Sequence, residues 1–132
     1  IIQGQIPRVL GWVGAYPVIN LRAMQDAMPS DKKPLIRWAY GMAGDGSDEA
    51  ARWATTTAGY DPMLADPAVF TGLPMLLLAS PDDTVVSMAS HALAFVGRVS
   101  AYALTTLVQT TGNHGDASHY RPEDMLGFLG GL

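Results

Sequence analysis

The chain has 132 residues, of which 48% are hydrophobic and only 15% are charged, and its formal net charge is −4. This length suits one domain, and the composition excludes a disordered chain. The scattered Lys and Arg residues exclude the basic surface of a nucleic-acid-binding protein, and the absence of Cys excludes disulfides and thiolate metal sites. Because the apolar share is high for a small free-standing domain, we expect another segment or chain to cover part of the surface.

The first residues, IIQGQIPRVL, contain no initiator Met and no signal-peptide pattern. We therefore expect the chain to be a fragment, either the interior of a longer protein or the product of a cut. The longest apolar run, LPMLLLA at 73–79, is too short to span a bilayer, so no membrane span is predicted. Nothing in the sequence indicates a cellular location.

Three short apolar segments, each ended by turn residues, predict buried strands. They are RVLGWVGAY at 8–16, LPMLLLAS at 73–80 and AYALTTLVQT at 101–110. A helix is predicted over 87–99, because four apolar residues share one helical face there: Met88, Ala92, Phe95 and Val96. A strand, such a helix and another strand make the smallest parallel crossover.

A second amphipathic helix is predicted over 121–132, where Pro122 suits the first turn. The stretch 20–72 predicts a lid-like insertion with two short helices, PLIRWAYGM at 34–42 and SDEAARWATTTAG at 47–59. It is longer than a single helical connection requires and is rich in turn residues. Its Trp38, Met42 and Trp53 are candidates for an acyl pocket or for a core, and both alternatives stay open.

Acidic residues and a histidine follow two of the predicted strands. SPDDTVV, with Asp82 and Asp83, comes after the second strand, and TGNHGD, with His114, comes after the third. Because parallel strands end at the same edge of a sheet, we expect these two loops to meet there. A carboxylate that orients a histidine, and a histidine that takes a proton, are two members of a nucleophile triad.

The segments YPVINL, FTGLPMLLLASPDDTVV and GNHGDASHYRPEDMLGFL together resemble the α/β-hydrolase superfamily, in particular its esterase- and lipase-like members. The resemblance implies an α/β fold, with the last three parallel strands of an α/β-hydrolase sheet, flanking helices and a helical lid-like insertion. Residues 1–132 would then be the C-terminal part of one hydrolase domain. The implied substrate is a small-molecule ester or related acyl compound, and no metal or cofactor is implied.

The resemblance assigns the triad acid to Asp83, with Ser80 in the small position before it and Val85 and Val86 after it. Asp82 is the alternative acid. The catalytic histidine falls on His114, in the Gly-Asn-His-Gly context of a tight exposed loop.

The serine of such a triad is missing from the sequence. No G-x-S-x-G motif occurs, although the family carries its nucleophile in one. The nearest candidate, Ser47 in GDGSDEA, is followed by Asp48 and Glu49, whose charges would repel a developing oxyanion. Since the family places this motif before the strand at 8–16, we expect the serine on an upstream segment or a companion chain.

Two other interpretations remain. The chain is alternatively a non-catalytic binding or structural module that has a hydrolase-like fold. A metal site would use His114, Asp116 and His119 with Asp82 or Asp83 as ligands for zinc or manganese, although this spacing matches no known motif. Otherwise Asp116 and His119 are expected to stabilise the loop, Asp116 through an Asx turn and His119 by packing on the last helix, and His91 is expected to be structural.

Overall fold

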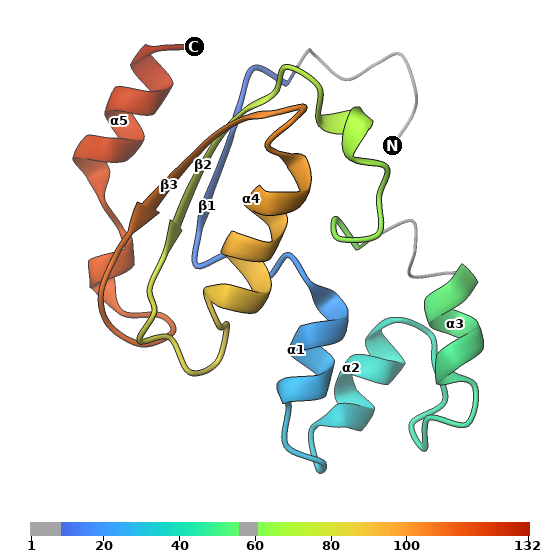
Figure 1. Ribbon diagram of the computed structural model, residues 1–132. Helices are drawn as coiled ribbons and strands as arrows, with labels where there is room; N and C mark the ends of the chain where they lie inside the picture. The colour runs from blue at the N-terminus through green and yellow to red at the C-terminus, as the bar shows by residue number, and fades with distance from the viewer. Residues whose placement is uncertain (1–8, 56–60) are drawn as a thin grey trace. The chain divides into compact units, whose positions relative to one another are not determined.

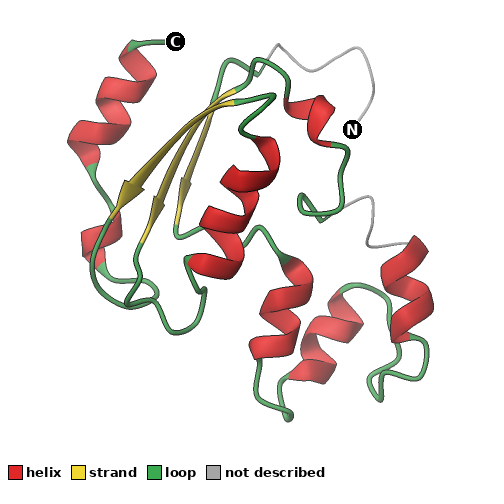
Figure 2. Ribbon diagram, viewed as in Figure 1, coloured by secondary structure: helices red, strands yellow, loops and turns green. Residues whose placement is uncertain are grey.

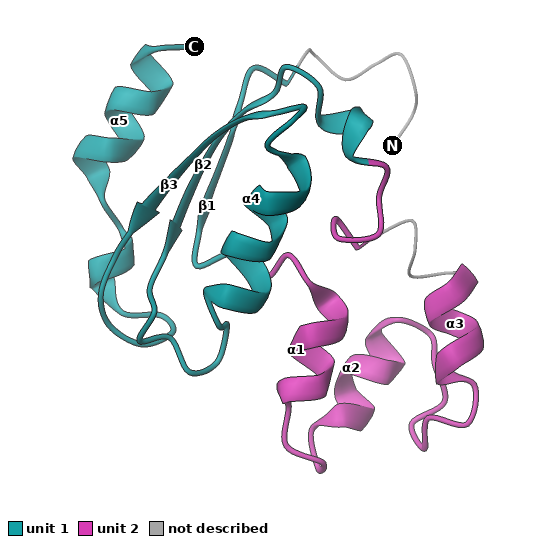
Figure 3. Ribbon diagram, viewed as in Figure 1, with its two compact units in different colours: residues 1–17, 67–132 teal, residues 18–66 magenta. Residues whose placement is uncertain are grey.

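The computed structural model describes residues 9–55 and 61–132. These residues form a mixed α/β fold with five α-helices and a three-stranded parallel sheet (Figures 1 and 2). The chain divides into two compact units, residues 1–17 with 67–132 and residues 18–66, which we call unit 1 and unit 2 (Figure 3). Within the described part of the chain, no helix has the length and apolar character to cross a membrane.

The sheet belongs to unit 1 and has β2 at its centre. Its strands are β1 (Trp12–Ala15), β2 (Pro74–Ala79) and β3 (Leu104–Gln109), in the order β1-β2-β3. The three predicted strands are confirmed with shorter bounds, and residue 8 of the first lies outside the described residues. Both neighbours of β2 are parallel to it, so the three strands end at the same edge of the sheet.

The core of unit 1 is built around β2. Residues 75–79 are between 0% and 4% exposed, and successive side chains of a strand point to opposite faces, so both faces of β2 are covered. On the predicted helical face, Ala92 and Phe95 are at most 2% exposed. The ring of Phe95 meets that of Phe70 edge-on at 5.4 Å, which ties the helix to the 3-10 turn Pro67–Phe70.

The helix predicted over 87–99 consists of two segments. A π-helical turn, Ala89–Leu93, continues into α4 (Ala94–Val99). His91 lies in the π-helical turn and is 2% exposed. The predicted C-terminal helix is α5 (Pro122–Gly130), and the sheet lies between α4 and α5 in Figure 1.

Unit 2 contains three short helices, α1 (Leu21–Ala27), α2 (Lys33–Ala39) and α3 (Glu49–Thr55). The sequence predicted two of them. The additional helix, α1, begins after Asn20, whose side-chain oxygen accepts a hydrogen bond from the Ala23 N–H at 3.0 Å. The helix expected over 47–59 starts at Glu49, and its part from residue 56 onward lies outside the described residues.

A polar network connects the helices of unit 2. Glu49 accepts hydrogen bonds from Gln25 Nε2 at 2.5 Å and from Arg37 Nε at 2.8 Å, so residues of α1, α2 and α3 meet at one carboxylate. Of the candidate pocket residues, Met42 and Trp53 are 3% exposed and therefore belong to a core, whereas Trp38 is 62% exposed.

Candidate functional site

Asp83 lies in the turn that follows β2, with only 1% of its side chain exposed. Its Oδ1 accepts hydrogen bonds from the Val85 and Val86 N–H groups at 2.9 and 2.8 Å, so the turn closes around the carboxylate. Burial opposes the charged form, but these bonds and the bond to His114 favour it. The balance holds the pKa of Asp83 below its ordinary value, and the group is ionised at neutral pH.

His114 lies in the loop after β3 and faces the second oxygen of this carboxylate. Its Nδ1 is 3.0 Å from Asp83 Oδ2. An ionised carboxylate can only accept hydrogen bonds, so Nδ1 carries the proton and Nε2 is the basic nitrogen. Nε2 makes no hydrogen bond to any residue that the structure describes, and 30% of the side chain is exposed. The imidazole is therefore oriented on one side and accessible on the other.

Asn113 joins the loop of Asp83 to the loop of His114. Its Oδ1 accepts hydrogen bonds from the Thr84 N–H at 2.9 Å, the Thr84 hydroxyl at 3.1 Å and the His114 N–H at 2.9 Å. The preceding Gly112 has φ +90°, and a Cβ there would lie 2.6 Å from Asp116 Oδ2. Asn113 is not among the residues predicted from the sequence. Its role depends on Thr84, 29 positions away in the chain, and no local pattern marks that contact.

His119 supports the same loop from inside. It is 0% exposed, with Nδ1 2.9 Å from Thr110 Oγ1 and Nε2 2.9 Å from the Asn113 carbonyl oxygen. Because a carbonyl only accepts, Nε2 donates to Asn113 and Nδ1 accepts from the Thr110 hydroxyl. The expected loop-stabilising role of His119 is confirmed.

Asp116 also stabilises the loop, but not through the Asx turn that the sequence predicted. Its Oδ2 accepts from the N–H of Asn113, three residues before it, at 2.7 Å. The metal interpretation needed Asp116 and His119 as ligands, and both are engaged in these hydrogen bonds. Among residues 9–55 and 61–132, no three or more His, Cys, Asp or Glu side chains are arranged to hold a metal ion.

Tyr16 lies directly after β1, and its ring contacts both histidines of the loop. The ring centroids are 4.8 Å from His114 and 4.9 Å from His119, both in edge-on geometry. The Tyr16 hydroxyl is hydrogen-bonded to the Tyr120 hydroxyl at 2.5 Å. This bond, burial and the nearby Tyr120 charge raise the pKa of Tyr16. Tyr16 is not among the residues predicted from the sequence, because its contact with Tyr120 spans 104 positions of the chain.

The Asp83–His114 pair does not include the two other candidates, Asp82 and Ser47. Asp82 is exposed and its N–H donates to Ser80 Oγ at 3.0 Å, so Asp83 is the carboxylate that meets His114. Ser47 belongs to unit 2, where its N–H donates to Asp45 Oδ1 at 2.9 Å.

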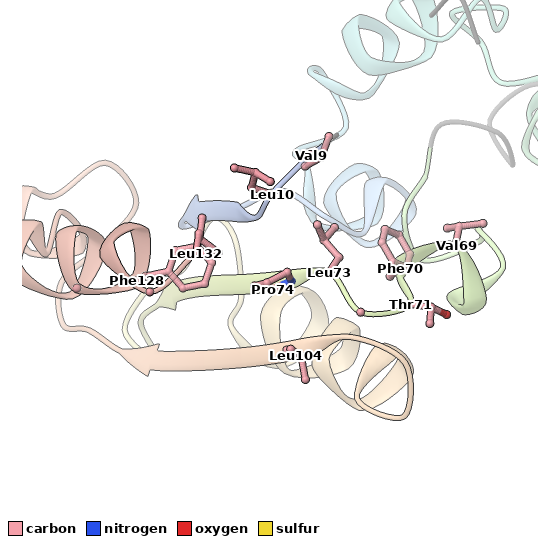
Figure 4. A pocket seen from close by; sticks show the side chains of 13 residues that line it. Val9, Leu10, Val69, Phe70, Thr71, Leu73, Pro74, Leu104, Phe128 and Leu132 are labelled. Atoms are coloured by element: carbon pink, nitrogen blue, oxygen red, sulfur yellow. The ribbon is translucent and has the colours of Figure 1, made fainter. Parts of the chain in front are cut away.

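A cavity of about 890 Å³ lies at the opposite edge of the sheet, where the strands begin (Figure 4). The side chains around it include Val9, Leu10, Leu73, Leu104 and Leu132. None of its lining residues is titratable, so it offers no acid–base chemistry. Within unit 1, the Asp83–His114 pair lies instead at the other edge, where the strands end.

Comparison of the chain with protein-family models, with curated proteins and with solved structures gives no match. Its chemistry is inferred from the side chains alone. An imidazole whose Nδ1–H is held by a buried carboxylate, and whose Nε2 is accessible, is a general base for a hydroxyl, a thiol or a water molecule.

Proposed function

We propose that this chain supplies the acid and the histidine of a Ser-Asp-His triad in an α/β-hydrolase that acts on carboxylic esters or related acyl substrates. The observation that carries the proposal is the 3.0 Å contact between Asp83 Oδ2 and His114 Nδ1. The acid follows β2 and the histidine follows β3 of a parallel sheet, which agrees with the family's order of acid before histidine.

In this mechanism His114 Nε2 takes the proton of the serine hydroxyl while the serine oxygen attacks the acyl carbon. The same nitrogen then gives that proton to the departing alcohol, and an acyl-enzyme remains. A water molecule then attacks: Nε2 takes its proton and the hydroxyl adds to the acyl carbon. The bond between the acyl carbon and the serine oxygen breaks, the carboxylic acid leaves, and the proton on Nε2 returns to the serine oxygen. Asp83 holds the Nδ1–H tautomer throughout and stabilises the imidazolium each time it forms.

The serine in this proposal belongs to an upstream segment or a companion chain. The sequence contains no G-x-S-x-G motif, and the outer edge of β1 has no strand partner among the described residues. An upstream strand that pairs with this edge would bring the nucleophile to the same edge of the sheet as His114. In this proposal residues 1–132 are the C-terminal part of one hydrolase domain, and the stretch 20–72 is its lid-like insertion. Residues 20–66 of that stretch belong to unit 2, whereas residues 67–72 belong to unit 1.

The test uses the protein expressed from its full-length coding sequence and assayed with nitrophenyl esters. We expect His114→Ala and Asp83→Asn each to lower kcat/KM by about 10³- to 10⁴-fold, as loss of a triad member does. Asp82→Asn is the matched control, because it removes the adjacent but exposed carboxylate, and it should leave the rate close to that of the wild type.

Retained turnover in His114→Ala would refute the assignment of the base. Equal losses in Asp82→Asn and Asp83→Asn would refute the choice of acid. If the wild-type protein hydrolyses no ester and a fluorophosphonate labels no serine, the non-catalytic binding or structural module replaces the hydrolase.

A further inference from the structure

We infer that Tyr16 is a positioning residue, whose ring fixes the plane of the His114 imidazole against Asp83. The catalytic consequence of this inference rests on the proposed function. The contact between the two rings is independent of the proposed function, because both residues belong to unit 1.

One hydrogen bond does not fix an imidazole. The Asp83 contact holds Nδ1, but the ring can still tilt about that bond, and 30% of the side chain is exposed. Proton transfer at Nε2 depends on the direction of its lone pair, so the plane of the ring matters as much as the position of Nδ1. The Tyr16 ring meets His114 at an interplanar angle of 74°, which is the preferred edge-on geometry of aromatic pairs and restrains this tilt.

Tyr16 is itself held on several sides. Its N–H donates to the Leu78 carbonyl oxygen at 2.7 Å, which anchors the backbone to β2. Its ring meets the buried His119 at 4.9 Å, and its hydroxyl is bonded to that of Tyr120. A ring fixed in this way can impose an orientation on the more exposed His114.

The backbone conformation of Tyr16 is unfavourable for a tyrosine, which indicates that the contacts of its side chain maintain it. Tyr16 has φ +38°, in the left-handed region that Gly or Asn enters more easily than a bulky aromatic residue. The next residue is Pro17, and a residue before proline ordinarily favours an extended backbone. Such a conformation persists only where the surrounding contacts determine it. Here those contacts are the two histidines and Tyr120.

The experiment observes the His114 Nδ1 proton by NMR in isotopically labelled protein. Tyr16→Asn removes the ring while suiting the left-handed backbone, and Tyr16→Leu removes the aromatic edge while keeping an apolar side chain. We expect both to broaden or abolish the Nδ1 proton signal. Tyr16→Phe keeps the ring and should retain most of the signal. Tyr102→Phe, an exposed tyrosine of the same unit, is the control and should change nothing.

In the ester assay we expect Tyr16→Leu to lower kcat by about 10- to 100-fold, the size of effect that misplacing a catalytic group produces, with little change in KM. An unchanged Nδ1 signal in Tyr16→Leu would overturn the inference, and this variant decides the matter if Tyr16→Asn does not fold. Loss of the signal in Tyr16→Phe as severe as in Tyr16→Leu would also overturn it, because the hydroxyl rather than the ring would then be responsible.

The two proposals can fail separately. A wild-type protein that hydrolyses no ester, but whose Nδ1 signal depends on the Tyr16 ring, contradicts the proposed function and supports the positioning role. A protein that hydrolyses esters, with signal and kcat unchanged in Tyr16→Leu, supports the proposed function and contradicts the positioning role.

Discussion

Asp83 is a buried, charged carboxylate inside a closed turn. Its charge should make the free energy of unfolding depend on pH. Its pKa is below the ordinary value of 3.8, so near that pH the folded protein binds fewer protons than the unfolded chain. The stabilisation is therefore present above pH 3.8 and is lost as the pH falls through the folded pKa. We expect Asp83→Asn to lower the free energy of unfolding at neutral pH by about 1–3 kcal/mol and to flatten its decline in acid.

Urea unfolding between neutral pH and about pH 3 measures this effect. Asp82→Asn is the control, since Asp82 is exposed and should leave both the stability and its pH profile unchanged. A wild-type profile that is just as flat as that of Asp83→Asn would contradict the lowered pKa.

Single residues also show how far sequence reasoning reaches. The meeting of the Asp83 and His114 loops could be predicted because turn residues mark the ends of the parallel strands β2 and β3. The resemblance to the α/β-hydrolases favoured Asp83 over Asp82, and the catalytic roles of the pair stay a prediction. The roles of Tyr16 and Asn113 could not be predicted, because they come from contacts with residues far away in the chain. An Asn or a Tyr in a loop has no local pattern that reveals such a partner.

Among the elements, α4 and α5 should differ in how much a truncated side chain lowers the stability. Phe95 of α4 is 2% exposed and packs on Phe70, so Phe95→Ala should lower the free energy of unfolding by about 3–5 kcal/mol through the cavity that it leaves. Leu126 of α5 is 69% exposed, so Leu126→Ala should change stability by less than about 0.5 kcal/mol. Chemical denaturation compares the two, and equal losses would mean that the face of α4 is not the one that supports the sheet.

The elements with a clear hydrophobic period were the ones that the sequence predicted. The strands and the face of α4 follow from their apolar patterns, whereas the π-helical turn before α4 has no periodicity of its own. Helix α1 was missed although Asn20, a strong N-cap residue, could have marked its start.

At the scale of the whole molecule, the division into two units predicts that unit 2 can be unfolded by mutation while unit 1 stays folded. Trp53 is 3% exposed in unit 2, so Trp53→Ala should destabilise that unit by about 3–5 kcal/mol and reduce the helical circular-dichroism signal. The His114 Nδ1 proton signal should persist, because the residues that hold His114 all belong to unit 1. Simultaneous loss of both signals would show that the chain unfolds as one cooperative unit.

The parallel sheet also gives unit 1 two ends that can be engineered separately. Asp83, His114 and Tyr16 lie where the strands finish, whereas Leu10 and Leu104, at 60% and 67% exposed, lie where they start. Six residues of β2 separate the two ends by roughly 20 Å. Polar replacements at the starting end can therefore improve the solubility of a purified sample, and the acid–base pair keeps its surroundings.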